Sequence, residues 1–536
     1  MFSIKYSLLV LAVLAGLIDG LKIAIFSPDV AGGQLIFNKK VAETLAKSGH
    51  SITFFRLRAL GYKHLEVHID QRQVKVADVI AYTDEDFNAF HREQGAFIFS
   101  NASLFSPQAF SAYHQYANVS VTSCAELLTS TSFILNLREE AFDIAFASSF
   151  DYCSIGLIHE AKVPTWIWLN AGPLSDLVAE DIGVPSPPSY VPFGFSESTD
   201  RLTFPQRVAN VLLKAFWPHF ARKVIADPET ALFRKHIRED FPDLRELARQ
   251  APLVFVDSQP FYDFTRPTLE KVISVGGLGL VNQPAKNLTE SYTTLIDKFD
   301  NIALVSFGTV ADSTQLPTEW KEALLNVFAK FPRILFVVRY SGVDLEHLAP
   351  TNVFLVPFFP QHDLMQHRKT ILLLTNGGFA SIQEAIYNGI PVIVVPLFGD
   401  QRKNAHLVEK HGFGLALSKS EVSETTLYDS IKEVLSTKRY YNSATRLQNL
   451  VLSQPFTAEE KVVKWTEFLA RHKNISNLEP AGNQLNFIEY HNIDVFALFG
   501  VVILLSLYVL YGVLYLIAAP FLSSGHAAPR EHVKFE

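Results

Sequence analysis

Short strand-like segments alternate with helix-like segments along most of the chain, and this alternation limits the folds that it can adopt. In the first half the strand-like runs are 23–26, 52–55, 143–147, 165–169 and 253–257, and a helical stretch, 35–48, separates the first two. In the second half the runs are 302–307, 334–338, 371–374, 392–396 and 414–417. Such alternation predicts parallel βα units with helices on both faces of each sheet. Because 536 residues exceed what one hydrophobic core usually organises, we expect two doubly wound α/β domains, 21–285 and 286–475.

Both ends of the chain carry apolar segments, and these differ in length. Lys5 precedes the run 8–18, which is too short to span a bilayer and predicts a cleavable signal peptide, 1–20. The segment 495–522 contains no charged residue and is long enough to cross a bilayer, so we expect one transmembrane helix there after a juxtamembrane segment, 476–494. Arg530 and Lys534 follow it, which predicts that 523–536 is a cytosolic tail and that the bulk of the chain is luminal.

Charge and cysteine content narrow the function classes. The net charge is −7 and the chain has no tract rich in Lys and Arg, so nucleic acid is not an expected partner. Cys124 and Cys153 are too few for a disulfide framework, and whether they pair is left open. The sequons agree with a luminal body; they begin at Asn101, Asn118, Asn287 and Asn474.

The segment from 202 to 225 mixes Leu, Val, Phe216 and Trp217 with Arg and Lys residues. This mixture is compatible with a helix that lies on a membrane surface, and equally with an ordinary surface helix. Pro218 is expected to interrupt it.

Residues 360–404 have the features of a pocket for a nucleotide sugar. After the strand 371–374, Gly377 and Gly378 let backbone N–H groups approach a ligand, and the following helix, 379–387, presents a positive dipole end that suits a diphosphate. Glu384 lies on that helix, where its carboxylate could accept hydrogen bonds from ribose hydroxyls. Asp400 and Gln401 follow the next strand and could hold the hydroxyls of a hexose.

These residues stand in motifs that closely resemble the signature of the UDP-glycosyltransferases, and above all the animal UDP-glucuronosyltransferase group. The motifs are 358–367, 375–378 and 400–404, together with 306–309, 258–260, 266–267 and 275–277. The resemblance covers almost the whole chain. It implies the GT-B architecture, in which two Rossmann-like domains bind the acceptor and the donor, and the chemistry takes place in the cleft between them. It also implies a UDP-sugar as co-substrate and a small lipophilic acceptor, with no other cofactor and no metal.

The resemblance assigns most of the donor contacts. The positions that match the family pattern or stand at its contact sites are Thr309, Phe358, Gln361, Asn376, Gly377, Gly378, Glu384, Asp400 and Gln401. Phe358 replaces the tryptophan expected to stack on uracil and keeps an aromatic face. Asn376 replaces a histidine; it can donate a hydrogen bond to phosphate but carries no positive charge, so weaker stabilisation of the leaving group is expected.

The family's proton-transfer pair is replaced. Gln34 stands at the position of the expected histidine base, and Ser148 at that of the acid that orients it. An amide cannot take a proton at physiological pH, so the expected base is missing. Asp29 and Asp151 are speculative substitutes, although each is more commonly a loop residue or a helix cap. His114 and His159 are candidates only by proximity in the sequence.

Two main functions therefore remain open. The first is a glucuronosyltransferase-like enzyme, a single-pass type I protein of the endoplasmic reticulum membrane, that transfers a hexose or hexuronic acid to a small lipophilic acceptor. The second is a catalytically impaired relative that binds UDP-sugar or an active paralogue, in a homo- or hetero-oligomer, and acts as a regulator. Glu384 and the pair Asp400 and Gln401 argue against a third reading, a lectin or lipid-handling module.

Overall fold

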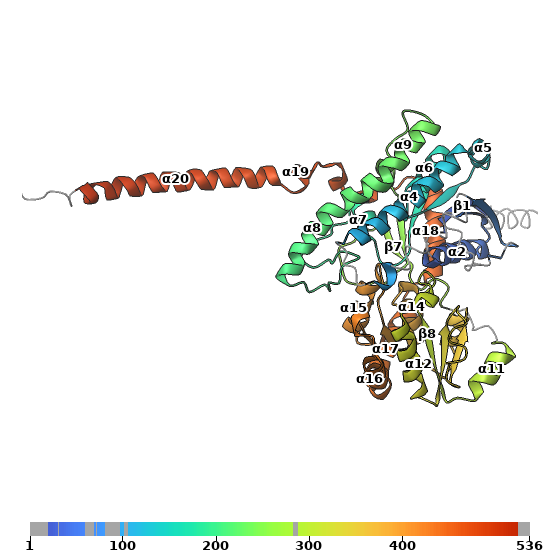
Figure 1. Cartoon of the computed structure of the whole chain (residues 1–536). Helices are drawn as coiled ribbons and strands as arrows, with labels where there is room; N and C mark the ends of the chain where they lie inside the picture. Colours follow the sequence, from blue (N-terminus) through green and yellow to red (C-terminus); the bar gives the residue numbers. More distant parts are fainter. Residues whose placement is uncertain are drawn as a thin grey trace, which may run out of the picture. The chain divides into compact units, whose positions relative to one another are not determined.

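The computed structural model describes residues 20–29, 32–58, 69–70, 72–80, 97–100, 106–281 and 288–523 (Figure 1). They belong to two compact units, 1–479 and 480–536, which are described separately. Most of the predicted signal peptide, the tail from residue 524 onward, and the sequons at Asn101 and Asn287 lie outside the described residues.

The first sheet contains seven parallel strands in the order β3-β2-β1-β4-β5-β6-β7. Their bounds are β1 Lys22–Pro28, β2 Ser51–Arg58, β3 Val74–Ile80, β4 Ile144–Ser148, β5 Trp166–Asn170, β6 Leu253–Val256 and β7 Val272–Ser274. All five strands predicted for the first half are present. β3 and β7, the two edge strands, were not predicted.

The second sheet contains six parallel strands in the order β10-β9-β8-β11-β12-β13. Their bounds are β8 Asn301–Ser306, β9 Ile334–Arg339, β10 Val353–Val356, β11 Thr370–Thr375, β12 Val392–Val394 and β13 Gly414–Ala416. The five predicted strands are again present, and β10, an edge strand, is the additional one. We call each sheet, together with the helices that cover it, a lobe.

Helices connect the strands and cover both faces of each sheet (Figure 1). Before β8 they are α2 Gly32–Lys47, α4 Pro107–Thr129, α5 Thr131–Glu139, α6 Cys153–Glu160, α7 Asp176–Asp181, α8 Phe204–Ala221, α9 Asp227–His236, α10 Leu244–Arg249 and α11 Glu290–Asp297. After β8 they are α12 Thr318–Ala329, α13 Gln361–Met365, α14 Phe379–Asn388, α15 Gln401–His411, α16 Glu424–Ser436, α17 Lys438–Leu452 and α18 Ala458–His472.

Both sheets are buried on both faces because helices cover each face. Successive residues of a strand point to opposite sides and therefore enter different apolar clusters. On β1, Ala24 and Phe26 enter one apolar cluster, while Ile23 and Ile25 enter the other. The second lobe has the same arrangement, with one cluster on each face of its sheet. Each fully buried large apolar side chain contributes roughly 1.5–3 kcal/mol, so these two layers of packing fix where the strand ends lie.

The strand order reverses once in each sheet, between β1 and β4 in the first and between β8 and β11 in the second. In open parallel sheets ligands bind beyond the carboxyl ends of the strands at such a switch point. Ser148 ends β4, and Thr375 ends β11 opposite Ser306 of β8. The predicted base and donor segments therefore begin at the switch points of the two sheets.

The last helix of the first unit returns to the first lobe. α18, which lies within the predicted second domain, packs against α2, and the two helices lie side by side in Figure 1. Ala458, Val462 and Leu469 of α18 join the apolar cluster that also holds Ile23 of β1. The chain thus passes between the lobes twice, once between β7 and β8 and again between α17 and α18.

Two local features of the first lobe answer questions that the sequence leaves open. Cys124 of α4 and Cys153 at the start of α6 form a disulfide bond with a Cα–Cα distance of 5.8 Å. By loop-closure entropy such a bond stabilises the fold by roughly 3 kcal/mol.

The expectation that Pro218 interrupts its helix is wrong, because α8 continues to Ala221 and then widens into a π-helical turn, Arg222–Ala226, that leads into α9. The helix tolerates the backbone N–H that proline lacks, because the wider turn after it adjusts the hydrogen bonding of the backbone.

The second unit consists mainly of one long apolar helix. α19, Phe487–Tyr490, precedes α20, Ile493–Ser523. Within α20 the segment Ile493–Ala519 has a mean hydropathy of 2.6. Among the helices that the structure describes, it is the one that is long and apolar enough to cross a membrane. This candidate span coincides with the predicted transmembrane segment, 495–522.

Candidate functional site

The turn between β11 and α14 brings backbone N–H groups to the carboxyl edge of the second sheet. Gly377 has a φ of +81°, and a Cβ at this position would lie 2.5 Å from Cγ1 of Val394, so only glycine fits. Gly378 is the N-cap of α14, and its side chain, a hydrogen, leaves the first N–H groups of the helix uncovered. The positive end of the helix dipole and these donors make the turn suitable for a phosphate group.

The loop after β8 faces the same turn. Gly308 has a φ of +85°, and a Cβ there would lie 2.8 Å from Nδ2 of Asn376. The Oδ1 atom of Asn376 accepts the N–H of Gly378 at 3.2 Å, which fixes the amide and turns Nδ2 toward the loop that carries Thr309. The structure therefore brings Thr309, Asn376, Gly377 and Gly378 together at the β8 and β11 switch point.

Gln361 and Glu384, predicted separately, are in direct contact. Nε2 of Gln361, the first residue of α13, donates to Oε2 of Glu384 at 2.6 Å and to Oγ of Ser381 at 3.1 Å. Ser381 and Glu384 therefore lie on the side of α14 that faces α13, and Glu384 is about a turn and a half into the helix. A carboxylate held by an amide in this way can accept hydrogen bonds from a neighbouring pair of hydroxyls.

Phe358 presents an open aromatic face beside Gln361. Its side chain is 70% exposed, whereas that of the next residue, Phe359, is buried in the core of the second lobe. The guanidinium of Arg339 lies 5.8 Å from the centre of the Phe358 ring. The guanidinium lies over one face of this exposed ring, and the other face is a stacking platform for a planar base.

Asp400 and Gln401 occupy different environments at the start of α15. Oδ2 of Asp400 accepts Nδ2 of Asn404 at 2.8 Å, and burial raises the pKa of Asp400 although that hydrogen bond opposes the rise. Gln401 is buried, and its Oε1 accepts the backbone N–H groups of Leu397 at 2.8 Å and Phe398 at 3.1 Å. Gln401 thus shapes the turn that presents Asp400, and only its Nε2 is left to meet a sugar hydroxyl.

At the switch point of the first sheet, amides and hydroxyls take the place of an ionisable pair. Nε2 of Gln34 donates to Oδ1 of Asn38 at 2.7 Å, and Nδ2 of Asn38 donates to Oγ of Ser27 at 2.9 Å. Oγ of Ser148 and Oε1 of Gln34 are buried and have no hydrogen-bond partner among the described residues. None of these four side chains can accept a proton at neutral pH.

Ionisable groups nevertheless lie near this point. Asp29 is buried and directly follows β1, and its backbone N–H donates to the carbonyl of Leu57 at 3.0 Å. Asp151 is buried at the start of α6, and loss of solvation raises its pKa to about 6 while hydrogen bonds from the N–H groups of Ser154 and Cys153 oppose the rise. The buried carboxyl of Asp151 therefore has a pKa much closer to neutral pH than an exposed aspartate has.

The sequence did not point to the partner of Asp151. Glu229 of α9 is fully buried, and its Oε2 accepts the N–H of Tyr152 at 2.9 Å. Burial raises its pKa well above the usual value, and the charge of Asp151 raises it further. In the sequence, a glutamate in the first turn of a helix is expected to be solvated and to interact favourably with the helix dipole. Only the tertiary packing shows that Glu229 is buried beside Asp151.

The two histidines considered as bases lie elsewhere. His159 is at the far end of α6 from Asp151, where its Nε2 is 3.3 Å from Nη2 of Arg238, and burial lowers its pKa. His114 is exposed on α4, with its ring 5.3 Å from that of Phe220. Proximity in the sequence was therefore misleading for His159.

Comparison with known proteins identifies the same family along nearly the whole chain. The model of the family described as UDP-glucoronosyl and UDP-glucosyl transferase matches residues 25–526. The putative UDP-glucuronosyltransferase ugt-48 of Caenorhabditis elegans is 27% identical over 481 residues, which are 88% of this chain and 90% of that protein. Human UDP-glucuronosyltransferase 1A1 is 30% identical over 384 residues, which are 72% of this chain and 71% of that protein.

Solved structures share the fold. The glycosyltransferase of kitacinnamycin superposes with a TM-score of 0.57 at 16% identity, covering 85% of this chain and 100% of that one. The calicheamicin glycosyltransferase CalG4 gives a TM-score of 0.55 at 15% identity, covering 84% and 99%. These neighbours confirm the predicted GT-B architecture of two α/β lobes.

Proposed function

Because the chain belongs to the UDP-glucuronosyl and UDP-glucosyl transferase family, we propose that it binds a UDP-sugar in the second lobe and transfers its hexose or hexuronic acid to a small lipophilic acceptor. The observation that carries this proposal is the convergence of four segments at one edge of the second sheet. Phe358 offers a stacking face, Gln361 and Glu384 a ribose contact, the Asn376 turn a phosphate contact, and Asp400 a sugar contact.

In this proposal each group acts on a separate part of the donor. The ring of Phe358 stacks on uracil, and Glu384 accepts hydrogen bonds from the ribose hydroxyls. The N–H groups at the start of α14 and the amide of Asn376 stabilise the diphosphate as charge develops on the leaving group. An uncharged amide stabilises that charge less than a protonated histidine, so a slow leaving-group step is expected.

The test is titration of UDP into the full chain by calorimetry, followed by a UDP-release assay with a broad acceptor panel. We expect saturable UDP binding that Glu384→Ala weakens at least tenfold, because loss of a charge-assisted hydrogen bond costs roughly 1.5–3 kcal/mol. Glu433→Ala, an exposed glutamate on α16, is the matched control and should leave binding unchanged. Absence of heat with UDP, in a sample with a cooperative thermal unfolding transition, would contradict the proposal.

One observation favours a second function, that of a catalytically impaired regulator which binds UDP-sugar or an active paralogue. The hydrogen-bonded series of Gln34, Asn38 and Ser27 contains no proton acceptor, and Ser148 stands in place of an acid. If the chain is impaired for this reason, Gln34→His combined with Ser148→Asp should create UDP release from a silent parent. Release by the unaltered chain at the rate of the double variant would exclude this alternative.

For its location, we propose a single-pass type I protein of the endoplasmic reticulum membrane with the bulk of the chain in the lumen. The candidate span in α20 and the membership of the glucuronosyltransferase family support this placement. The disulfide between Cys124 and Cys153 is consistent with it, since disulfides persist in oxidising compartments.

A further inference from the structure

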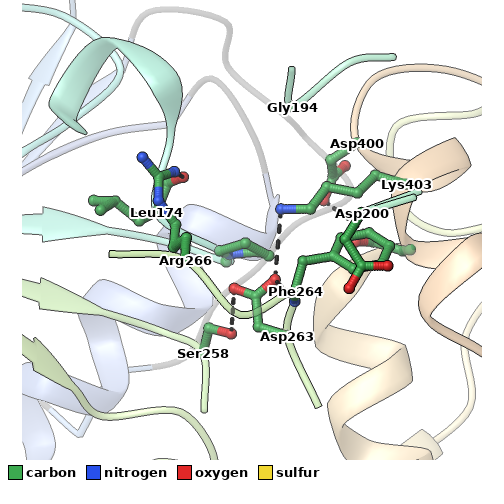
Figure 2. Close-up of polar contacts among 12 residues, drawn as sticks. Leu174, Gly194, Asp200, Ser258, Asp263, Phe264, Arg266, Asp400 and Lys403 are labelled. Atoms are coloured by element: carbon green, nitrogen blue, oxygen red, sulfur yellow. Dashed lines mark hydrogen bonds and ion pairs between the residues drawn. The ribbon is translucent and has the colours of Figure 1, made fainter. Parts of the chain in front are cut away.

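Arg266, in the loop between β6 and β7 of the first lobe, has buried hydrogen-bond donors without acceptors. Its Nε and Nη2 atoms have no partner among the described residues. Only Nη1 donates a bond, to the carbonyl of Leu174 at the long distance of 3.4 Å (Figure 2). Burial lowers the pKa of Arg266, but a guanidinium stays charged at any physiological pH. An unsatisfied buried donor, above all a charged one, is costly and requires an explanation.

The nearest carboxylates do not satisfy Arg266, because both are used by other groups. Oδ1 of Asp176 accepts Nζ of Lys214 at 2.9 Å, and its Oδ2 accepts the N–H of Gly194 at 2.7 Å. Oδ2 of Asp263 accepts the hydroxyl of Ser258 at 3.2 Å, and its Oδ1 accepts the N–H of Phe264 at 2.7 Å. Nζ of Lys403 lies 3.5 Å from the same Oδ1 atom (Figure 2).

Two further cations belong to the same cluster. The pKa of Lys214 is lowered, mainly by burial, and the positive charges of Arg266 and Lys403 add to this effect. Lys403 comes from α15 of the second lobe, three residues after Asp400, whereas Lys214 comes from α8 of the first lobe. The charge of Lys403 also acts on Asp400, so three cations face three carboxylates in this cluster, and among the described residues Arg266 is the cation of the three without an ion pair.

The two unused atoms of Arg266 form a recognition edge. Nε and Nη2 point in the same direction from a guanidinium and match the two oxygens of a carboxylate. Arg56 uses the same two atoms on Asp78 in this structure, at 2.5 and 2.8 Å. We propose that Arg266, supported by Lys403, binds a carboxylate group of a substrate between the two lobes.

This inference rests on the proposed function, which supplies two sources for the carboxylate. It belongs either to a hexuronic acid on the donor, next to Asp400, or to a carboxylic acid acceptor that enters from the first lobe. In both cases the group arrives as an anion and replaces the missing acceptor of Arg266. The cation next to it, Lys403, strengthens the attraction without taking the bidentate position.

The experiment measures binding by the full chain in detergent with two matched pairs of probes. The donor pair is UDP-glucuronic acid and UDP-glucose, and the acceptor pair, titrated in the presence of UDP, is 4-butylbenzoate and 4-butylbenzyl alcohol. We expect the wild-type chain to prefer the carboxylate member of one pair by about 10- to 100-fold, the range of a charge-assisted bidentate contact. The pair that shows the preference identifies the source.

The variant Arg266→Gln should abolish this preference and leave the affinity for UDP and for the neutral probe unchanged. Arg266→Lys should keep a reduced preference, because an ammonium retains the charge but not the planar edge. Lys410→Gln is the control: it breaks the ion pair with Asp200 between the same two lobes without removing a group that faces Arg266. It should retain the wild-type preference.

A wild-type chain that binds UDP yet distinguishes neither pair would overturn the carboxylate site and leave the proposed function intact. A preference that survives in Arg266→Gln would overturn it as well. If that variant does not fold, the wild-type titrations together with Arg266→Lys decide the matter. Absence of UDP binding in all variants would instead refute the proposed function itself.

Discussion

Asp151 and Glu229 accept hydrogen bonds from the same backbone N–H group, that of Cys153. Burial raises the pKa of both carboxyl groups, and the charge of Asp151 raises the pKa of Glu229 further. Glu229 reaches this position from α9, and Asp151 from the loop after β4. The protonation of the pair therefore contributes to the stability of the first lobe.

The stability of the chain should fall as the pH rises through the titration of this pair. Carboxyl groups of the unfolded chain titrate near pH 4, whereas burial raises the pKa of Asp151 to about 6 in the fold and raises that of Glu229 well above its usual value. Over this interval the folded chain binds more protons than the unfolded one, so the free energy of unfolding decreases with rising pH, by on the order of 3 kcal/mol.

Chemical denaturation between pH 4 and pH 8 measures this effect. Glu229→Gln should stabilise the chain above pH 6 and reduce the slope, because an amide removes the repulsion and keeps the hydrogen bond to Tyr152. Glu239→Gln changes an exposed glutamate and should leave the slope unchanged. A wild-type chain whose stability does not depend on pH over this range would show that the pair stays ionised or stays protonated.

The exposed ring of Phe358 should provide much of the affinity for UDP. Phe358→Ala is expected to weaken UDP binding by about 1–3 kcal/mol, the usual contribution of stacking a base on an aromatic ring. Phe358→Trp should bind UDP more tightly, since the indole offers more area. Calorimetric titration of the two variants beside Phe456→Ala, another exposed ring, provides the comparison. Equal affinity of the wild-type and Phe358→Ala chains would place uracil elsewhere.

At the residue scale, sequence reasoning identified groups whose role depends on local chain geometry. The placement of Gly377 and Asn376 on a turn and of Glu384 on the next helix was predictable because adjacent residues determine such a unit, while their roles stay a prediction. Glu229 and Arg266 were not, because both resemble solvated surface charges until distant segments bury them. Gln401 is a third case. It was predicted to contact the ligand, but its Oε1 atom already accepts a hydrogen bond from the backbone N–H of Leu397.

At the scale of elements, the strands that the sequence did not reveal are all at sheet edges. β3, β7 and β10 are edge strands, while every predicted strand except β13 is internal. Internal strands are buried on both sides and form continuous apolar runs, which are easy to recognise. β3 carries Lys75 and Asp78 and β7 has only three residues, so neither shows such a run, whereas β10 is apolar throughout but only half-buried.

α8 leaves large apolar side chains exposed although it buries a polar residue. Asn210 is buried and bonds the backbone of Phe193 and Val191, whereas Phe204 and Leu212 are 70% and 62% exposed. The exposed apolar residues follow helical spacing; they are Phe204, Val208, Val211, Leu212 and Phe216. Such a face on a chain with a candidate membrane span fits a lipid surface.

We therefore expect α8 to bind membranes independently of α20. A chain ending at Glu479, the boundary of the first compact unit, should float with liposomes in a density gradient. Leu212→Ser with Val211→Ser should reduce the bound fraction about tenfold without lowering the melting temperature, because both side chains are exposed. Val343→Ser, an exposed apolar residue outside α8, is the control. Equal flotation of all three proteins would make α8 an ordinary surface helix.

At the scale of the whole molecule, glycan attachment tests the proposed orientation. Asn118 on α4 and Asn474 after α18 are both exposed and lie in the first unit. If that unit is luminal, Asn118→Gln and Asn474→Gln should each remove one glycan from the protein made in microsomes, seen as a mass shift that glycosidase abolishes. Digestion of the first unit by protease added outside sealed microsomes would show that this unit faces the cytosol and would contradict the proposed topology.

The two-lobed fold was predictable because strand and helix alternation is a repeated local signal that is read independently in each half of the chain. The return of α18 to the first lobe was not. An amphipathic helix indicates only that one of its faces is buried, and nothing in residues 458–472 specifies which sheet covers that face.

This double passage of the chain has a mechanical consequence. A domain joined to another by one connection can rotate in every direction. A domain joined by two connections rotates mainly about one hinge axis, the line through the two connections. The connections from β7 to β8 and from α17 to α18 define such a line. Any movement of one lobe about this line would keep the facing edges of the two lobes in the same alignment.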